Sequence, residues 1–80
     1  MSTSPDTADL LVNALSRWLA RSVANDELLT EVEQIGAAGL SEEQADAVDE
    51  LVVELRGARP FERGGLEMVV RETIESLALG

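Results

Sequence analysis

Residues 40–57, LSEEQADAVDELVVELRG, contain the clearest structural signal in the chain. Ser41 and Gln44 have the spacing of a capping box, in which each side chain bonds the other residue's backbone at a helix start. Leu40 and Ala45 flank this box and can form a hydrophobic staple around it. The apolar residues that follow recur at helical spacing and share one side, namely Ala45, Val48, Leu51, Val52 and Leu55. This stretch therefore predicts an amphipathic helix that begins after Ser41 and stops at Gly57.

Upstream of this stretch, two more segments show helical periodicity, separated by residues that favour turns. The first is expected over about residues 5–24, with Ser4 as its N-cap and Pro5 at its first position. The second is expected over about residues 26–37, after an Asn25 cap. Their inward faces consist of Ala8, Leu11, Val12, Leu15, Trp18, Leu19 and Val23 in the first, and Leu28, Leu29, Val32 and Ile35 in the second.

Downstream, a last helix is expected to begin between Pro60 and Leu66, since the Gly64 and Gly65 pair weakens its first turn. Its inward face consists of Leu66, Val69, Val70, Thr73, Ile74 and Leu77. No segment alternates with the period of a β-strand. The sequence therefore predicts an all-α fold, a compact bundle of four short helices joined by short connections.

Eighty residues suffice for one domain, so residues 1–80 are expected to form a single helical domain, with residues 1–4 disordered. A domain of this size has a thin stability margin, and such domains often gain burial by self-association. A homodimer is therefore one arrangement that the length favours. The chain has no Cys and no His, which removes disulfides and the usual zinc and haem ligands. No cofactor and no metal are expected.

Catalytic residue types are also scarce. The chain has no His, Cys, Lys or Tyr, so the common general bases, the thiol nucleophile and the Schiff-base amine are missing. Carboxylate pairs remain, but they need a cleft that an eighty-residue bundle offers little room for. The sequence therefore predicts a protein that is not an enzyme.

Charge is distributed unevenly along the chain. The stretch from Asp26 to Glu54 holds ten carboxylates and no Arg or Lys, while the flanks are neutral, so it accounts for the whole net charge of −10. Such a field attracts cationic partners and repels nucleic acid and anionic membrane surfaces. Nothing at the N-terminus resembles a signal peptide, and no apolar run approaches membrane-spanning length. We therefore expect a cytoplasmic protein that binds neither nucleic acid nor membrane.

Some apolar residues depart from the inward faces. Val53 lies within the acidic side of its helix, Met68 points away from the last inward face, and Phe61 is expected on the same side as Met68. Leu10 lies opposite the main apolar side of the first helix. Single exposed apolar residues are ordinary, but several together mark an interface.

These features predict a protein-protein interaction or adaptor module whose partner carries a basic surface. Like charges four residues apart on a helix are destabilising, so a partner, or Arg17 and Arg21 folding back, would compensate them. Association should weaken with salt and slow after charge reversal at Glu43, Glu50 and Glu54. The candidate contact residues are Glu42, Glu43, Asp46, Glu50, Val53, Glu54, Phe61 and Met68.

Two other functions remain open on the same residues. In one, an acidic inhibitor or antitoxin masks the nucleic-acid-binding surface of a basic partner, with carboxylates in the place of phosphates. In the other, the domain is a structural homodimer in which the last helix supplies the seam.

Residues 33–40, EQIGAAGL, resemble the stretch that precedes the second helix of acyl and peptidyl carrier proteins, which are also acidic four-helix domains of about this length. Where that family has Asp-Ser-Leu, this chain has Ala38, Gly39 and Leu40. The serine that takes the phosphopantetheine arm is therefore missing. The resemblance implies at most a degenerate carrier-like helical domain.

Overall fold

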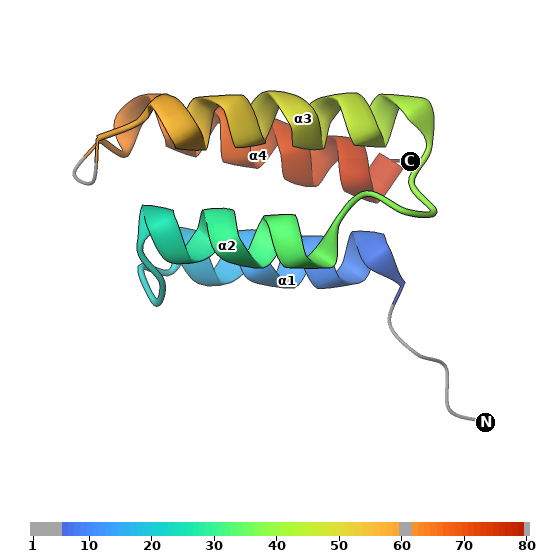
Figure 1. Cartoon of the computed structure of the whole chain (residues 1–80), viewed down its shortest axis with the longest axis horizontal. Coiled ribbons are helices and arrows are strands. Elements are labelled where there is room, and N and C mark those ends of the chain that lie inside the picture. Colours follow the sequence, from blue (N-terminus) through green and yellow to red (C-terminus); the bar gives the residue numbers. More distant parts are fainter. Residues whose placement is uncertain (1–5, 60–61, 80) are drawn as a thin grey trace.

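The computed structural model describes residues 6–59 and 62–79, and within them the fold is all-α, as predicted. Four helices follow one another: α1 (Thr7–Leu19), α2 (Asn25–Ile35), α3 (Glu42–Gly57) and α4 (Gly64–Leu79). They form two antiparallel hairpins, α1 with α2 and α3 with α4 (Figure 1). The hairpins stack so that α1 packs against α4 and α2 packs against α3. The predictions about residues 1–4 and Phe61 lie outside the described residues.

Helix α1 is shorter than predicted at both ends. Its N-cap is Asp6, whose backbone is extended and whose side chain accepts a hydrogen bond from the Asp9 backbone N–H, so the predicted start at Pro5 is wrong. The helix ends at Leu19 instead of near residue 24, because Arg21 takes a left-handed φ of 64° that no α-helix continues through. This early end gives the chain room to turn into α2.

The start of α3 is confirmed in detail. Ser41 accepts a hydrogen bond from the Gln44 backbone N–H, and the Gln44 side chain accepts one from the Ser41 backbone N–H. Helix α4 begins at Gly64, inside the predicted interval. Before α3, the connection from α2 turns through two left-handed residues, and both are glycines, Gly36 and Gly39.

The core lies between the two hairpins and draws on all four helices. Its buried apolar residues are Leu11, Ala14, Leu15, Trp18, Leu28, Val32, Val48, Leu51, Leu55, Leu66, Val70 and Leu77. Most of them belong to the predicted inward faces, and Ala14 was missed. Trp18 is the only tryptophan and is fully buried.

The predicted role of Asn25 as a cap is wrong. Ala24 occupies the N-cap position of α2 without a side-chain bond, and Asn25 is buried at the first position of the helix. Its Oδ1 accepts a hydrogen bond of 2.7 Å from Trp18 Nε1. Its Nδ2 donates to the carbonyls of Arg59 and Glu62, each at 3.2 Å. One amide thus joins the core tryptophan to the connection between α3 and α4.

Arg63 completes this junction from the side of α4. Its guanidinium lies over the Trp18 ring, 4.0 Å from the centroid, and its Nη2 donates a hydrogen bond of 2.7 Å to the Trp18 carbonyl. That carbonyl is at the C-terminal end of α1, where positive charge is favourable. The interaction therefore fixes α4 against α1 at the same end of the bundle.

Gln44 plays a similar part at the opposite end. Besides its role in the capping box, its Nε2 donates a buried hydrogen bond of 3.0 Å to the Leu77 carbonyl. The side chain thereby joins the first turn of α3 to the last turn of α4. It also fixes the register of the α3–α4 hairpin.

Replacement of Asn25 by Ala should lower the free energy of unfolding by about 2 to 3 kcal/mol, because it leaves Trp18 Nε1 and two carbonyls without their partner. Urea denaturation followed by circular dichroism measures this. Asn13→Ala, at an exposed site on α1, is the control and should change stability little. A loss at Asn25 no larger than at Asn13 would contradict the role of the amide.

Replacement of Gln44 by Glu separates the two roles of this residue. A carboxylate can still accept from the Ser41 backbone N–H, but when ionised it cannot donate to the Leu77 carbonyl. We expect a loss of about 1 to 3 kcal/mol at neutral pH, together with faster amide exchange in the last turn of α4. Gln34→Glu, at an exposed position of α2, is the matched control. Unchanged exchange in α4 would show that this bond does not hold the hairpin together.

Candidate functional site: an acidic face on α3 and α4

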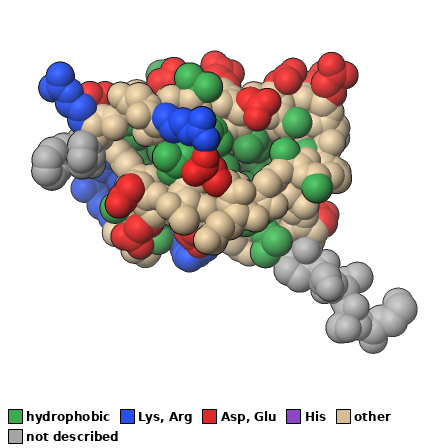
Figure 2. Space-filling model, viewed as in Figure 1, with side chains coloured by type: hydrophobic (Ala, Val, Ile, Leu, Met, Phe, Trp, Pro, Cys, Tyr) green, Lys and Arg blue, Asp and Glu red, His purple; other side chains and the backbone are tan. Residues whose placement is uncertain are grey.

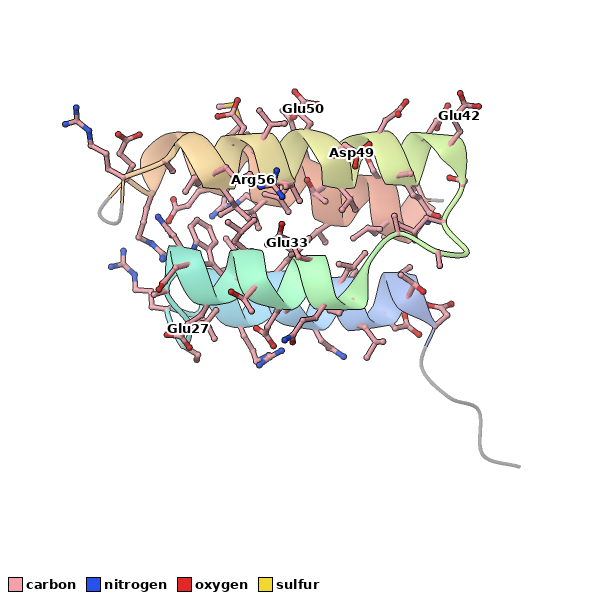
Figure 3. All side chains as sticks on the ribbon, in the orientation of Figure 1. Glu27, Glu33, Glu42, Asp49, Glu50 and Arg56 are labelled. Carbon is pink, nitrogen blue, oxygen red and sulfur yellow. The ribbon has the colours of Figure 1, made fainter. Side chains whose placement is uncertain are left out.

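The predicted acidic residues of α3 lie on its solvent side. Glu42, Glu43, Asp46, Glu50 and Glu54 are all exposed. Figure 2 shows acidic side chains along the edge of the molecule that α3 forms, and Figure 3 shows Glu42 and Glu50 pointing away from the bundle. Within residues 6–59 and 62–79, none of these five carboxylates takes part in an ion pair. Their charge is therefore available to a partner.

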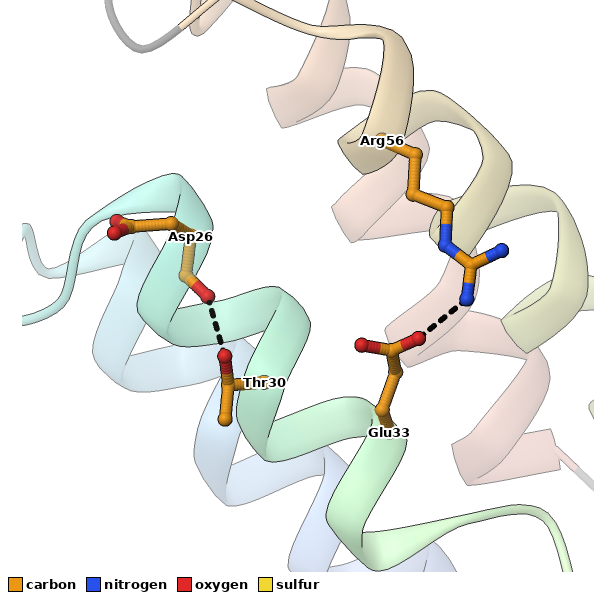
Figure 4. Close-up of polar contacts among 4 residues, drawn as sticks. All are labelled: Asp26, Thr30, Glu33 and Arg56. Carbon is orange, nitrogen blue, oxygen red and sulfur yellow. Dashed lines mark hydrogen bonds and ion pairs between the residues drawn. The ribbon is translucent and has the colours of Figure 1, made fainter.

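The acidic residues of α2 are in a different situation. Glu31 pairs with Arg17 of α1 at 2.6 Å, and Glu33 pairs with Arg56 of α3 (Figure 4). The expectation that Arg17 and Arg21 fold back onto the acidic helix α3 is therefore wrong. Arg17 is held by α2, and Arg21 makes no ion pair among the described residues.

Helix α4 adds carboxylates that are not among the predicted contact residues. Glu72, Glu75 and Leu79 line a shallow hollow together with Glu43 of α3. At the other end of the hairpin, Glu54 lines a second hollow with Val69. By charge count alone the α4 segment is neutral, because the arginines of residues 55–80 balance its acids in number. The spacing of Glu72 and Glu75, three residues apart and thus on one side of a helix, was the signal that could have identified them.

We call this surface the α3–α4 acidic face, and it comprises Glu42, Glu43, Asp46, Glu50 and Glu54 of α3 with Glu72 and Glu75 of α4. Two exposed apolar residues accompany it, Val53 at 68% and Met68 at 67% exposure. Gln44 of α3 bonds Leu77 of α4 across the antiparallel hairpin. Val53 lies nine residues after Gln44, and Met68 lies nine residues before Leu77. Val53 and Met68 are therefore at the same level along the hairpin.

Leu10 does not belong to this surface. It is 40% exposed, as predicted, but it lines a groove between α1 and α2 with Arg17, Glu31 and Ile35. Phe61, the remaining predicted contact residue, lies outside the described residues. The structure thus places Val53 and Met68 at the same level of the α3–α4 hairpin, both exposed, and separates Leu10 from them.

The acidic face presents carboxylates to solvent. Among the described residues, no three carboxylates are arranged so that they could hold a metal ion. No helix in this part of the chain has the length and hydropathy needed to cross a membrane. Comparison with protein-family models, with curated proteins and with solved structures finds no match.

Asp46 offers a test of the electrostatic cost of this face. It lies four residues from both Glu42 and Glu50, and each like-charge pair on a helix is destabilising by about 0.2 to 0.5 kcal/mol. Asp46→Lys turns both contacts into attractive ones and should raise the free energy of unfolding by about 1 kcal/mol. Thermal and urea denaturation measure the change.

Asp46→Gln serves as the matched control, because it removes the repulsion without adding attraction and should give a smaller gain. Both gains should shrink in about 1 M salt, where the Debye length is near 3 Å. Lower stability of Asp46→Lys at low salt would show that α3 is not under electrostatic strain.

Proposed function

We propose that this chain is a non-enzymatic protein-protein interaction or adaptor module that binds a partner with a basic surface through the α3–α4 acidic face. The observation that supports this most directly is that, within the described residues, none of the six carboxylates of α3 takes part in an ion pair, while Glu31 and Glu33 of α2 are paired. Lys or Arg side chains of a partner would supply the positive charges that these carboxylates lack within the described residues.

The energetics favour such a partner. Glu42, Asp46, Glu50 and Glu54 form a row with four-residue spacing, so each neighbouring pair adds repulsion to the free helix. Cations placed along this row would relieve the repulsion. A surface with an excess of one sign also steers encounters, and such steering raises association rates by about 10- to 1,000-fold at low salt.

The apolar contribution would come from Val53 and Met68. Interfaces typically combine a small apolar centre with a polar rim, and the centre contributes most of the binding energy. Both side chains are exposed and flanked by carboxylates of their own helices. An amphipathic basic segment, with apolar residues between its cations, matches this pattern.

The homodimer alternative receives less support from this surface. Two copies meeting through α4 would bring together helices in which Glu67, Glu72 and Glu75 outnumber the one arginine, Arg71, and an excess of like charges across an interface is unfavourable. A basic partner would instead be attracted by these carboxylates. The absence of Cys also suits the reducing cytoplasm, where we place the interaction.

Affinity capture with the immobilised protein at low salt, followed by elution with increasing salt, identifies basic partners. For a captured partner, Glu50→Lys with Glu54→Lys should slow association at least tenfold and flatten its dependence on salt, as measured by stopped-flow or surface plasmon resonance.

Asp9→Lys with Glu27→Lys is the matched control, because it changes the net charge equally at exposed sites away from the acidic face. Equal slowing by both double variants would mean that only net charge matters, and binding that does not change with salt would contradict the proposal. Competition by DNA or RNA for the captured partner would instead favour the inhibitor alternative.

A further inference from the structure

A hollow with an apolar floor runs between α2 and α3. Figure 2 shows hydrophobic side chains at its bottom. Near the start of α2 the hollow deepens into a pocket of about 360 Å³. Its apolar lining is Ala24, Leu29, Leu55 and Ala58, and its polar lining is Asn25, Asp26 and Arg56. This volume is at the small end of the range of about 300 to 1,000 Å³ for ligand sites, so it suits a single apolar group.

The charges around the pocket favour a cation beside that group. Asp26 is exposed and makes no ion pair among the described residues. The one arginine of the lining, Arg56, is directed to Glu33 across the hollow, as Figure 3 shows. Glu33 therefore neutralises the one positive charge among the described residues that line the pocket. An apolar group that carries a carboxylate would meet the repulsion of Asp26 and of a chain with net charge −10.

The Arg56–Glu33 pair does not close the hollow firmly. The side chains are 63% and 44% exposed. Ion pairs in such positions contribute about 0 to 1 kcal/mol, so their separation opposes an entering group only weakly.

We propose that this pocket binds an apolar side chain of the basic partner, with an adjacent Lys or Arg of the same partner segment on Asp26. The inference rests on the proposed function and adds an anchor to it. The acidic face attracts the partner, and the α2–α3 pocket holds it. A second copy of this chain does not suit the pocket, because it would bring a further net charge of −10.

The fluorescence of Trp18 provides a probe for this pocket. Asn25 lines the pocket and accepts the hydrogen bond of Trp18 Nε1, and Trp18 is the only tryptophan. An apolar group that enters the pocket alters the surroundings of Asn25, and therefore the emission of the indole. Binding elsewhere on α3 leaves this reporter unchanged.

The test uses a short, amidated, lysine-rich peptide with one central leucine, and the same peptide with alanine in place of leucine. Both are titrated into the full chain while tryptophan emission and ¹H–¹⁵N spectra are recorded. The leucine peptide should bind about 10-fold or more tightly than the alanine peptide, as expected for burial of one leucine. Only the leucine peptide should change the emission and shift the amides of Ala24, Leu29 and Ala58.

The second part of the test uses a variant in which a larger side chain fills the pocket. Ala24→Leu places an aliphatic side chain at an exposed lining position that makes no side-chain cap bond, so folding should persist. It should reduce the affinity for the leucine peptide to that of the alanine peptide. Ala37→Leu, at an exposed position outside the pocket, is the matched control and should leave the preference intact.

Equal affinities for both peptides, with shifts confined to α3 and α4 around Val53 and Met68, would overturn the pocket and leave the proposed function standing. The absence of shifts anywhere would count against both. Loss of the leucine preference in Ala24→Leu but not in Ala37→Leu would support the anchor.

Discussion

The Asn25 amide, with its bonds to Trp18 Nε1 and to the carbonyls of Arg59 and Glu62, is the constraint on which the arrangement of the two hairpins depends. Apolar packing between helices is non-directional, so it specifies their alignment less sharply than a buried hydrogen bond does. A buried amide that is bonded to both hairpins favours one alignment. The acidic face and the α2–α3 pocket both exist because α3 is held in that alignment.

The helices themselves were predictable because their signals are local. The capping box at Ser41 and Gln44 involves residues three apart, and it predicts the start of α3 correctly. Asn25 was misassigned because Asn before an apolar run is typical of an N-cap, whereas its partners at Arg59 and Glu62 are more than thirty residues away. The bond from Gln44 to Leu77 was missed for the same reason. Bonds over such separations leave no periodic pattern in a single sequence.

The candidate site was partly predictable for a related reason. Exposure of Val53 and Met68 follows from helical periodicity alone, and the structure confirms it. Counting charges along the chain could not show which carboxylates are paired. That depends on which helices are neighbours, and α2 lies within reach of both Arg17 and Arg56 while the outer side of α3 lies within reach of neither. The contribution of Glu72 and Glu75 likewise appears only when α4 is placed beside α3.

Helix α3 then connects the two surfaces, since its outer side carries the acidic face and its side toward α2 carries Leu55 and Arg56 of the pocket. In the binding mode that we propose, the two surfaces would act on different steps. Exposed charges act over about a Debye length and change mainly how often partners meet, whereas a buried apolar contact acts only after contact and slows separation. A chain of this size needs most of its apolar residues for its own core, so few remain for contact with a partner. One small apolar pocket together with long-range electrostatic attraction is compatible with such a composition.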